Sequence, residues 1–318
     1  MYQTKVIAID TGNWSVKTKT HAFPACLIES SHIQGMGNDT LLYEGREYAV
    51  ADRYLPPRND KHGDERYFLL SLIAIGRELT GSAGTAINLN ECVDVVLLAG
   101  LPPLHLRTMS GNFASYFTDR DTPICFALNG IPFKIRFKEA HIFPQGYAGV
   151  ATVLEQFKDV RTINVADIGG HTVDLLRLIG FRPDMSAVNS IYMGTGNLYQ
   201  RINERVRAKG LDNIPNSVIE GVLTGDPKVL IDASPERVDL INGCASGFAR
   251  ELLLEISRHG FDLAENRTVF IGGGSILLKE HIEKSKLASK PFFVWDIHAN
   301  ARGYHLLYEN RKAGRVQQ

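Results

Sequence analysis

Cysteine is scarce in this sequence of 318 residues, and its four cysteines stand far apart. Cys26, Cys92, Cys125 and Cys244 form no C-x-x-C pair, which argues against zinc ribbons and dithiol redox motifs. Secreted domains that depend on disulfides are dense in cysteine, whereas isolated thiols are typical of a reducing compartment. We therefore expect buried, unreactive cysteines in a cytoplasmic protein.

An excess of charge of either sign is also missing. Lysine and arginine total 35, aspartate and glutamate total 35, and neither end of the chain carries a basic run. Binding of nucleic acid through bulk charge requires a positive surplus. We expect no direct nucleic-acid partner, although this argument leaves a local basic patch open.

Long apolar runs are absent as well. No apolar segment approaches the roughly 20 residues that cross a bilayer, and the N-terminal MYQTKVIAID is typical of a strand rather than a signal peptide. We expect no membrane partner. Hydrophobic residues make up 44% of a chain longer than one typical core, so two domains are the default.

The most informative stretch lies near the middle of the chain and reads INVADIGGHTVDLLRL, residues 163–178. An apolar run leads into Asp167, Gly169 and Gly170 permit a tight reversal, and a second apolar run follows from Val173. This pattern predicts a β-hairpin. Glycines in its turn allow positive φ and close approach by a ligand, and successive backbone N–H groups can converge on an anion such as phosphate.

The N-terminal stretch VIAIDTGNWSVK, residues 6–17, repeats this pattern. An aspartate is followed by glycine two residues later and by a hydroxyl residue five later, in the two sets Asp10, Gly12, Ser15 and Asp167, Gly169, Thr172. A D-x-G turn by itself usually marks only a hairpin. Two matched turns about half a chain apart favour two like-built domains that face a shared phosphate-binding cleft.

The two copies differ in charge beside the turn. Seven residues after the aspartate stands Lys17 in the first copy and Asp174 in the second. A cation beside one turn and carboxylates beside the other suit a metal–polyphosphate ligand.

Three further positions are candidates for the same site. Pro144 near a helix start puts Gln145 at a helix N-terminus, either as a surface cap or as a residue that holds a water. Gly194-Thr195-Gly196-Asn197 opens a helix, and Tyr199 in the third glycine's place weakens a dinucleotide-binding interpretation. Gly272, Gly273 and Gly274 separate a buried strand from a helix, either as a structural turn or as a surface for a flat or anionic group.

Periodicity predicts most of the other elements. Helices are predicted over residues 67–80, 104–117, 198–209, 218–223, 235–259 and from 300; strands over 93–100, 187–193 and 291–296; and hairpins over 41–50 and 124–137.

Element order and five short motifs together resemble the actin superfamily over nearly the whole chain. These are the paired hairpins, the Pro144-Gln145 helix start, the triple-glycine turn and the terminal helix. The PQGYAGV stretch and the N-A-R-G ending look most like ParM/StbA-type bacterial or plasmid actin-like proteins. The resemblance implies an α/β, actin-like (ribonuclease H-like) two-domain ATPase fold with a nucleotide cleft between its domains.

The resemblance also implies a role for each matched residue. Lys17 would contact the β- and γ-phosphates, Asp10 and Asp167 would hold Mg²⁺ through water, and Gln145 would orient the attacking water. Asp167 is thereby counted with Gln145 as catalytic. The residues expected to contact ATP or ADP are Thr11, Gly12, Asn13, Gly169, Gly170, His171, Gly194, Asn197, Gly272, Gly273 and Gly274. His171 departs from the glycine or threonine common in relatives, and Asp174 departs from the histidine of eukaryotic actins while matching ParM-like proteins.

The implied activity is that of a cytoplasmic ATPase that polymerises into filaments and segregates plasmid DNA through a DNA-bound adaptor protein. The alternative is a non-polymerising ATPase of the same fold, either sugar kinase-like or a chaperone-like regulator. The expected domains are residues 1–157, with a small exposed subdomain at about 24–66 and the terminal helix 300–318, and residues 158–299. The exposed segment 30–66 is either a filament contact or a solvated loop.

Overall fold

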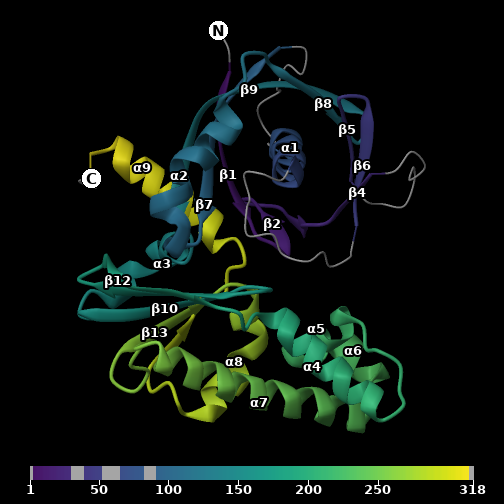
Figure 1. Cartoon of the computed structure of the whole chain (residues 1–318), viewed down its shortest axis with the longest axis vertical. Coiled ribbons are helices and arrows are strands. Elements are labelled where there is room, and N and C mark those ends of the chain that lie inside the picture. Colours follow the sequence, from purple (N-terminus) through teal and green to yellow (C-terminus); the bar gives the residue numbers. More distant parts are fainter. Residues whose placement is uncertain (1–2, 30–38, 52–64, 82–90, 315–318) are drawn as a thin grey trace. The chain divides into compact units, whose positions relative to one another are not determined.

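The computed structural model describes residues 3–29, 39–51, 65–81 and 91–314, and these form two compact units (Figure 1). Unit 1 comprises residues 1–152 and 298–318, and unit 2 comprises residues 153–297. No helix within the described residues is long and apolar enough to cross a membrane.

Unit 1 is built on a sheet with the strand order β3-β2-β1-β7-β9-β8-β5-β6-β4. β7 pairs in parallel with both β1 and β9, whereas β2 and β3 extend the sheet in antiparallel fashion. The strands are β1 (Thr4–Thr11), β2 (Ser15–Lys17), β3 (Ala22–Pro24), β4 (Leu27–Glu29), β5 (Thr40–Tyr43), β6 (Arg46–Val50), β7 (Val93–Leu101), β8 (Ile124–Leu128) and β9 (Ile131–Pro144).

Both faces of β1 and β7 are buried, as their continuous apolar sequences require. Ile7 and Ile9 point into a core with α1 (Glu65–Gly81) and with Phe113 of α2 (Pro103–Thr118). Ala8 points the other way, into a core with α9 (Ala299–Lys312). The sheet curves around α1, which contacts β1, β2, β5 and β8 and is buried on most sides (Figure 1).

The helix α3 (Tyr147–Ala151) packs closely against α9 at a glycine. A Cβ atom on Gly303 would lie 1.8 Å from the carbonyl oxygen of Ala148, so no larger residue fits without moving one of the helices. This contact sets the spacing of the two helices beneath the carboxyl end of β9.

Unit 2 contains a sheet with the order β12-β11-β10-β13-β14. The strands are β10 (Thr162–Ile168), β11 (Val173–Ile179), β12 (Arg182–Ile191), β13 (Arg267–Ile271) and β14 (Pro291–Phe293). The helix α8 (Gly273–Ser285) packs on this sheet, and α7 (Pro235–Arg258) packs on α8 and on α4 (Thr195–Ala208) (Figure 1). The shorter helices are η1 (Leu154–Phe157), α5 (Asn216–Thr224) and α6 (Pro227–Asp232).

The two units repeat one topology. In each, an antiparallel hairpin supplies the first two strands, a third strand extends it, and two parallel strands continue on the other side: β3-β2-β1-β7-β9 in unit 1 and β12-β11-β10-β13-β14 in unit 2. The α/β fold class and the internal repeat are therefore confirmed.

Most predicted elements are found within a few residues of their expected bounds. The hairpin turn at Asn129-Gly130 is confirmed, with φ values of 52° and 78° that suit this dipeptide. The predicted helix start at Pro144 is wrong, because Pro144 is the last residue of β9 and α3 begins at Tyr147. Within the predicted subdomain at 24–66, β5 pairs with β8 of the main sheet, and residues 30–38 and 52–64 lie outside the described residues.

Candidate functional site

The first turn lies between β1 and β2, and its register brings two charged residues together. Asp10 is directly opposite Lys17, so both side chains are on one face of the hairpin. A Cβ on Gly12 would lie 2.7 Å from the carbonyl oxygen of Ser15, which makes glycine necessary there. The hydroxyl of Tyr67, on α1, donates to Oδ1 of Asn13 and fastens the turn to the core.

Asp10 is a buried carboxylate, 6% exposed, that is held by uncharged donors. Nε2 of Gln145 donates to its Oδ1 at 2.7 Å, and the hydroxyl of Tyr304 lies 3.5 Å from the same oxygen. Nδ2 of Asn300 lies 3.5 Å from Oδ2. Charged carboxylates are rarely buried without such partners, so these three side chains make the position of Asp10 tolerable.

Gln145 is fixed through its backbone as well as its side chain. Its N–H donates to the carbonyl of Leu101 at 2.9 Å, and its carbonyl accepts from the N–H of Tyr147 at 2.8 Å. Because Nε2 is directed at Asp10, Oε1 is turned the opposite way and can accept a hydrogen bond from another group. Gln145 stands two residues before α3, since Gly146 caps that helix with a φ of 71°.

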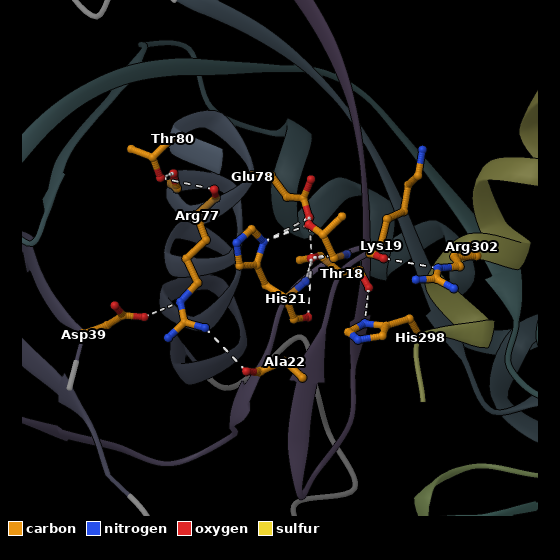
Figure 2. Close-up of polar contacts among 12 residues, drawn as sticks. Thr18, Lys19, His21, Ala22, Asp39, Arg77, Glu78, Thr80, His298 and Arg302 are labelled. Atoms are coloured by element: carbon orange, nitrogen blue, oxygen red, sulfur yellow. Dashed lines mark hydrogen bonds and ion pairs between the residues drawn. The ribbon is translucent and has the colours of Figure 1, made fainter. Parts of the chain in front are cut away.

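The connection that follows Lys17 is anchored at two ends (Figure 2). Glu78 of α1 accepts hydrogen bonds from the hydroxyls of Thr18 and Thr20, the latter at 2.7 Å, and its Oε1 lies 3.4 Å from Nδ1 of His21. Burial raises the pKa of Glu78, but these hydrogen bonds outweigh burial and leave the pKa below its usual value. Glu78 therefore stays ionised and holds the end of β2 against α1.

The second turn, between β10 and β11, directs its carbonyl groups at the start of α4. The N–H groups of Gly194, Thr195 and Gly196 donate to the carbonyls of residues 171, 169 and 170 at 2.9, 3.0 and 2.8 Å. In a trans peptide the C=O and the following N–H point in opposite directions. The N–H groups of residues 170, 171 and 172 therefore point away from α4, in the arrangement that binds anions.

The predicted use of positive φ in this turn is wrong, because Gly169 and Gly170 both have negative φ. Close contact is the reason for glycine nearby. A Cβ on Gly194 would lie 2.4 Å from the carbonyl carbon and oxygen of Gly170, so a side chain there would push α4 off the turn.

The triple glycine lies against the carboxyl end of β10. Gly272 has a φ of 88°, and a Cβ there would lie 2.5 Å from Oδ1 of Asp167. A Cβ on Gly274 would lie 2.4 Å from Cγ2 of Ile168 and 2.7 Å from Cγ2 of Thr195. A Cβ on Gly273 would meet nothing within 4 Å, so this glycine faces open space at the start of α8.

Two carboxylates face each other across the second hairpin. Asp167 is directly opposite Asp174, whose Oδ1 accepts from the hydroxyl of Ser190 at 2.6 Å. Like charges in this position destabilise a hairpin, and a bound cation would offset the cost. The oxygen donors suit Mg²⁺, which takes one or two carboxylates and keeps several waters. Among the described residues, no group of three or more histidine, cysteine or acidic side chains is arranged so that it could hold a metal ion by itself.

The remaining candidates differ in exposure. Burial lowers the pKa of His171, so its imidazole is neutral at pH 7 and adds no positive charge to the turn. Asn197 is exposed on the first turn of α4.

Parts of this chain are similar to known proteins in sequence, and nearly all of it is similar in structure. The family of archaeal actin homologues described as MreB-like, C-terminal, matches residues 165–284, which span the second turn and the triple glycine. The archaeal actin homologue Ta0583 is 16% identical, with a TM-score of 0.77 over 96% of this chain and 99% of that protein. This chain has the actin fold.

Two other actin-fold structures are similar over their whole length. The actin-like protein Alp7A is 14% identical, with a TM-score of 0.76, and covers 99% of this chain and 98% of its own. ParM in a 15-stranded filament from Clostridium botulinum is 17% identical, with a TM-score of 0.71, and covers 98% and 100%. Ta0583 has also been solved in complex with ADP. No curated protein is a significant match to the sequence. The predicted actin-like fold is therefore confirmed.

Within each unit the structure of this actin fold brings most predicted site residues together. Asp10, Lys17 and Gln145 meet in unit 1, and Asp167, the turn 169–171, Gly194 and the triple glycine meet in unit 2. Sequence reasoning missed Asn300 and Tyr304, which both reach Asp10. The signal available for Asn300 was an asparagine between two alanines at the start of the predicted terminal helix.

Proposed function

We propose that this chain binds Mg-ATP, hydrolyses it, and polymerises into filaments. The observation that carries the proposal is the geometry of the second turn. Backbone N–H groups at the start of α4 donate hydrogen bonds to three successive carbonyls of this turn, and the N–H groups that follow those carbonyls face the opposite way. The ADP complex of Ta0583 supports a nucleotide as the anion. The first turn, with the same offsets and the same topology, supports a second set of phosphate contacts.

We assign the nucleotide contacts to the residues of the two turns and their neighbours. Lys17 would contact the β- and γ-phosphates as a point charge, and the backbones of Thr11, Gly12 and Asn13 would line the first turn. The N–H groups of Gly170, His171 and Thr172 would bind phosphate at the second turn. Gly169 would only line the turn, because its own N–H donates to the carbonyl of Thr172 at 2.9 Å. Gly272, Gly273 and Gly274 would lie beside the adenosine. Gly194 and Asn197 would lie near the sugar.

Asp10 and Asp167 are the proposed holders of Mg²⁺ through water. When bound, Mg²⁺ would offset the negative charge of the phosphates. The opposed pair Asp167 and Asp174 supports a cation on this side, since their repulsion falls when one is present.

Gln145 is proposed to orient the attacking water. Its Nε2 is committed to Asp10, which leaves Oε1 as the acceptor for a water proton. The water oxygen would attack the γ-phosphorus, and the bond from that phosphorus to the bridging oxygen would break. ADP and phosphate would leave, and the proton of the water would pass to the phosphate oxygens or to solvent. A neutral amide is a weak base, so positioning is its contribution.

Polymerisation is supported by the filament structure of ParM from Clostridium botulinum. We extend the proposal to a cytoplasmic filament that moves plasmid DNA through a DNA-bound adaptor protein. The second candidate is a non-polymerising ATPase of the same fold, sugar kinase-like or chaperone-like. The exposed apolar side chains of Leu230 and Ile231 on α6 favour the polymer.

The test combines phosphate release with sedimentation. We expect the purified protein to release phosphate with Mg-ATP and to pellet with Mg-ATP but not with Mg-ADP. Gln145→Ala and Asp167→Ala should each slow phosphate release. Turnover without pelleting at any concentration would reject the filament and favour the second candidate, and normal turnover in both variants would reject the assigned site.

A further inference from the structure

Three polar side chains, one at the N-cap of α9 and two in its first turns, reach other parts of unit 1. Nδ1 of His298 lies 2.9 Å from the carbonyl oxygen of Thr18, and Nε of Arg302 donates to the carbonyl of Lys19 at 3.2 Å (Figure 2). Asn300 lies between them in sequence and points into the buried region around Asp10. His298 and Arg302 therefore hold the segment that follows β2, whereas Asn300 contacts the proposed site.

Asn300 is 7% exposed and makes two contacts of different kinds. Its Oδ1 accepts from the N–H of Gly146 at 2.9 Å, and its Nδ2 lies 3.5 Å from Oδ2 of Asp10. The orientation of the amide is determined by its partners, because an N–H requires the oxygen and a carboxylate requires the NH₂ group. One side chain thus joins the residue after Gln145 to the carboxylate that Gln145 itself binds.

These contacts close a ring of hydrogen bonds. Gln145 donates to Oδ1 of Asp10, Asn300 approaches Oδ2 of the same carboxylate, and Asn300 accepts from the residue next to Gln145. Gly146 has a φ of 71°, a conformation that needs glycine and a defined partner for its N–H. The backbone that aims the Gln145 side chain is therefore held by α9.

Packing alone does not explain why position 300 is an asparagine. Its neighbours Ala299 and Ala301 are 1% and 0% exposed, and alanine is the better helix former at such a position. A buried amide is tolerable only because both of its polar ends have partners.

We propose that Asn300 is a positioning residue that sets the orientation of Gln145 toward the attacking water. This inference rests on the proposed ATPase activity. Asn300 does not touch the nucleotide in this assignment. It acts through Gly146 and Asp10, so it affects turnover more than nucleotide affinity.

The test is a double-mutant cycle between Asn300→Ala and Gln145→Ala, measured as kcat and KM for phosphate release. We expect Asn300→Ala to lower kcat by roughly tenfold to a hundredfold, since small misplacement of a reacting group has effects of this size. The KM for ATP should stay within about threefold. If Asn300 acts through Gln145, the double variant should match Gln145→Ala, because the two losses are coupled.

Arg302→Ala is the matched control on the same helix. It removes an anchor to the carbonyl of Lys19 without touching Asp10 or Gly146, so its loss should be small and should multiply with that of Gln145→Ala. Thermal melting checks the fold of every variant. If Asn300→Ala does not fold, Asn300→Asp keeps an acceptor for Gly146 and still loses the amide donor beside Asp10, so lower kcat is again expected.

Two results would overturn the inference. One is a folded Asn300→Ala protein with wild-type kcat, and the other is a double variant whose loss is the product of the two single losses. A wild-type protein that neither binds nor hydrolyses ATP is a different result, because it rejects the proposed function itself.

Discussion

Asp10 and Asp167 occupy equivalent positions in the two hairpins, but their surroundings differ. Asp10 is opposite Lys17 and is contacted by three neutral donors, whereas Asp167 is opposite Asp174. The two carboxylates of the second hairpin repel each other, and a bound cation would reduce that repulsion.

We expect Asp174→Asn to stabilise the nucleotide-free protein by roughly 0.2–1 kcal/mol, the range for removing a like-charge pair across a hairpin. An asparagine can still accept from Ser190. The melting temperature, measured without and with magnesium, checks both effects, since the variant should also gain less from magnesium. Asp212→Asn, an exposed acid of the same unit, is the control. A lower melting temperature for Asp174→Asn would contradict the expectation.

A buried histidine gives unit 2 a pH-dependent stability. Burial lowers the pKa of His281, with Lys284 adding to the shift and Glu280 opposing it. The unfolded chain then binds the proton more readily, so this stability is present above about pH 6.5 and is lost as pH falls through the folded-state pKa. Below about pH 6.5, the melting temperature of His281→Gln should fall less steeply with pH than that of wild type. Above about pH 6.5, the two profiles should run parallel. An unchanged slope would count against this assignment.

At the scale of elements, α7 contains two glycines that its packing does not require. A Cβ on Gly243 or Gly247 would meet nothing within 4 Å, and both residues are exposed. Glycine in a helix interior costs about 0.5–1 kcal/mol relative to alanine. Gly243→Ala and Gly247→Ala should each raise the free energy of unfolding by about that amount in urea titrations. Gly303→Ala is the contrasting variant, because its Cβ would lie 1.8 Å from the carbonyl of Ala148, and it should destabilise the protein.

Elements defined by local pattern could be predicted from sequence, and contacts between distant elements could not. Asn129-Gly130 specifies its hairpin turn, and the apolar run into Asp167 specifies β10 and its turn. The ring around Asp10 joins residues 135 and 290 positions apart, so no spacing rule reveals it. Pro144 misled because proline suits both the first turn of a helix and the end of a strand.

At the scale of the whole molecule, an open polymer needs a contact between two different surfaces, because such contacts repeat without closing. The helix α6 offers one such surface. None of its six residues is buried, Ile231 is 82% exposed, and Leu230 is 38% exposed. A side chain as apolar as isoleucine gains from burial against another molecule.

We therefore expect Ile231→Asp to lower the fraction of protein that pellets with Mg-ATP, while the melting temperature stays that of wild type because nothing in the fold buries this side chain. Turnover at concentrations too low for polymerisation should also be unchanged. Asp232→Asn is the control, since it alters charge on the same exposed helix without changing its apolar area. Equal pelleting of Ile231→Asp and wild type across a concentration series would exclude α6 from the filament contact, and the polymer would then have to use another surface.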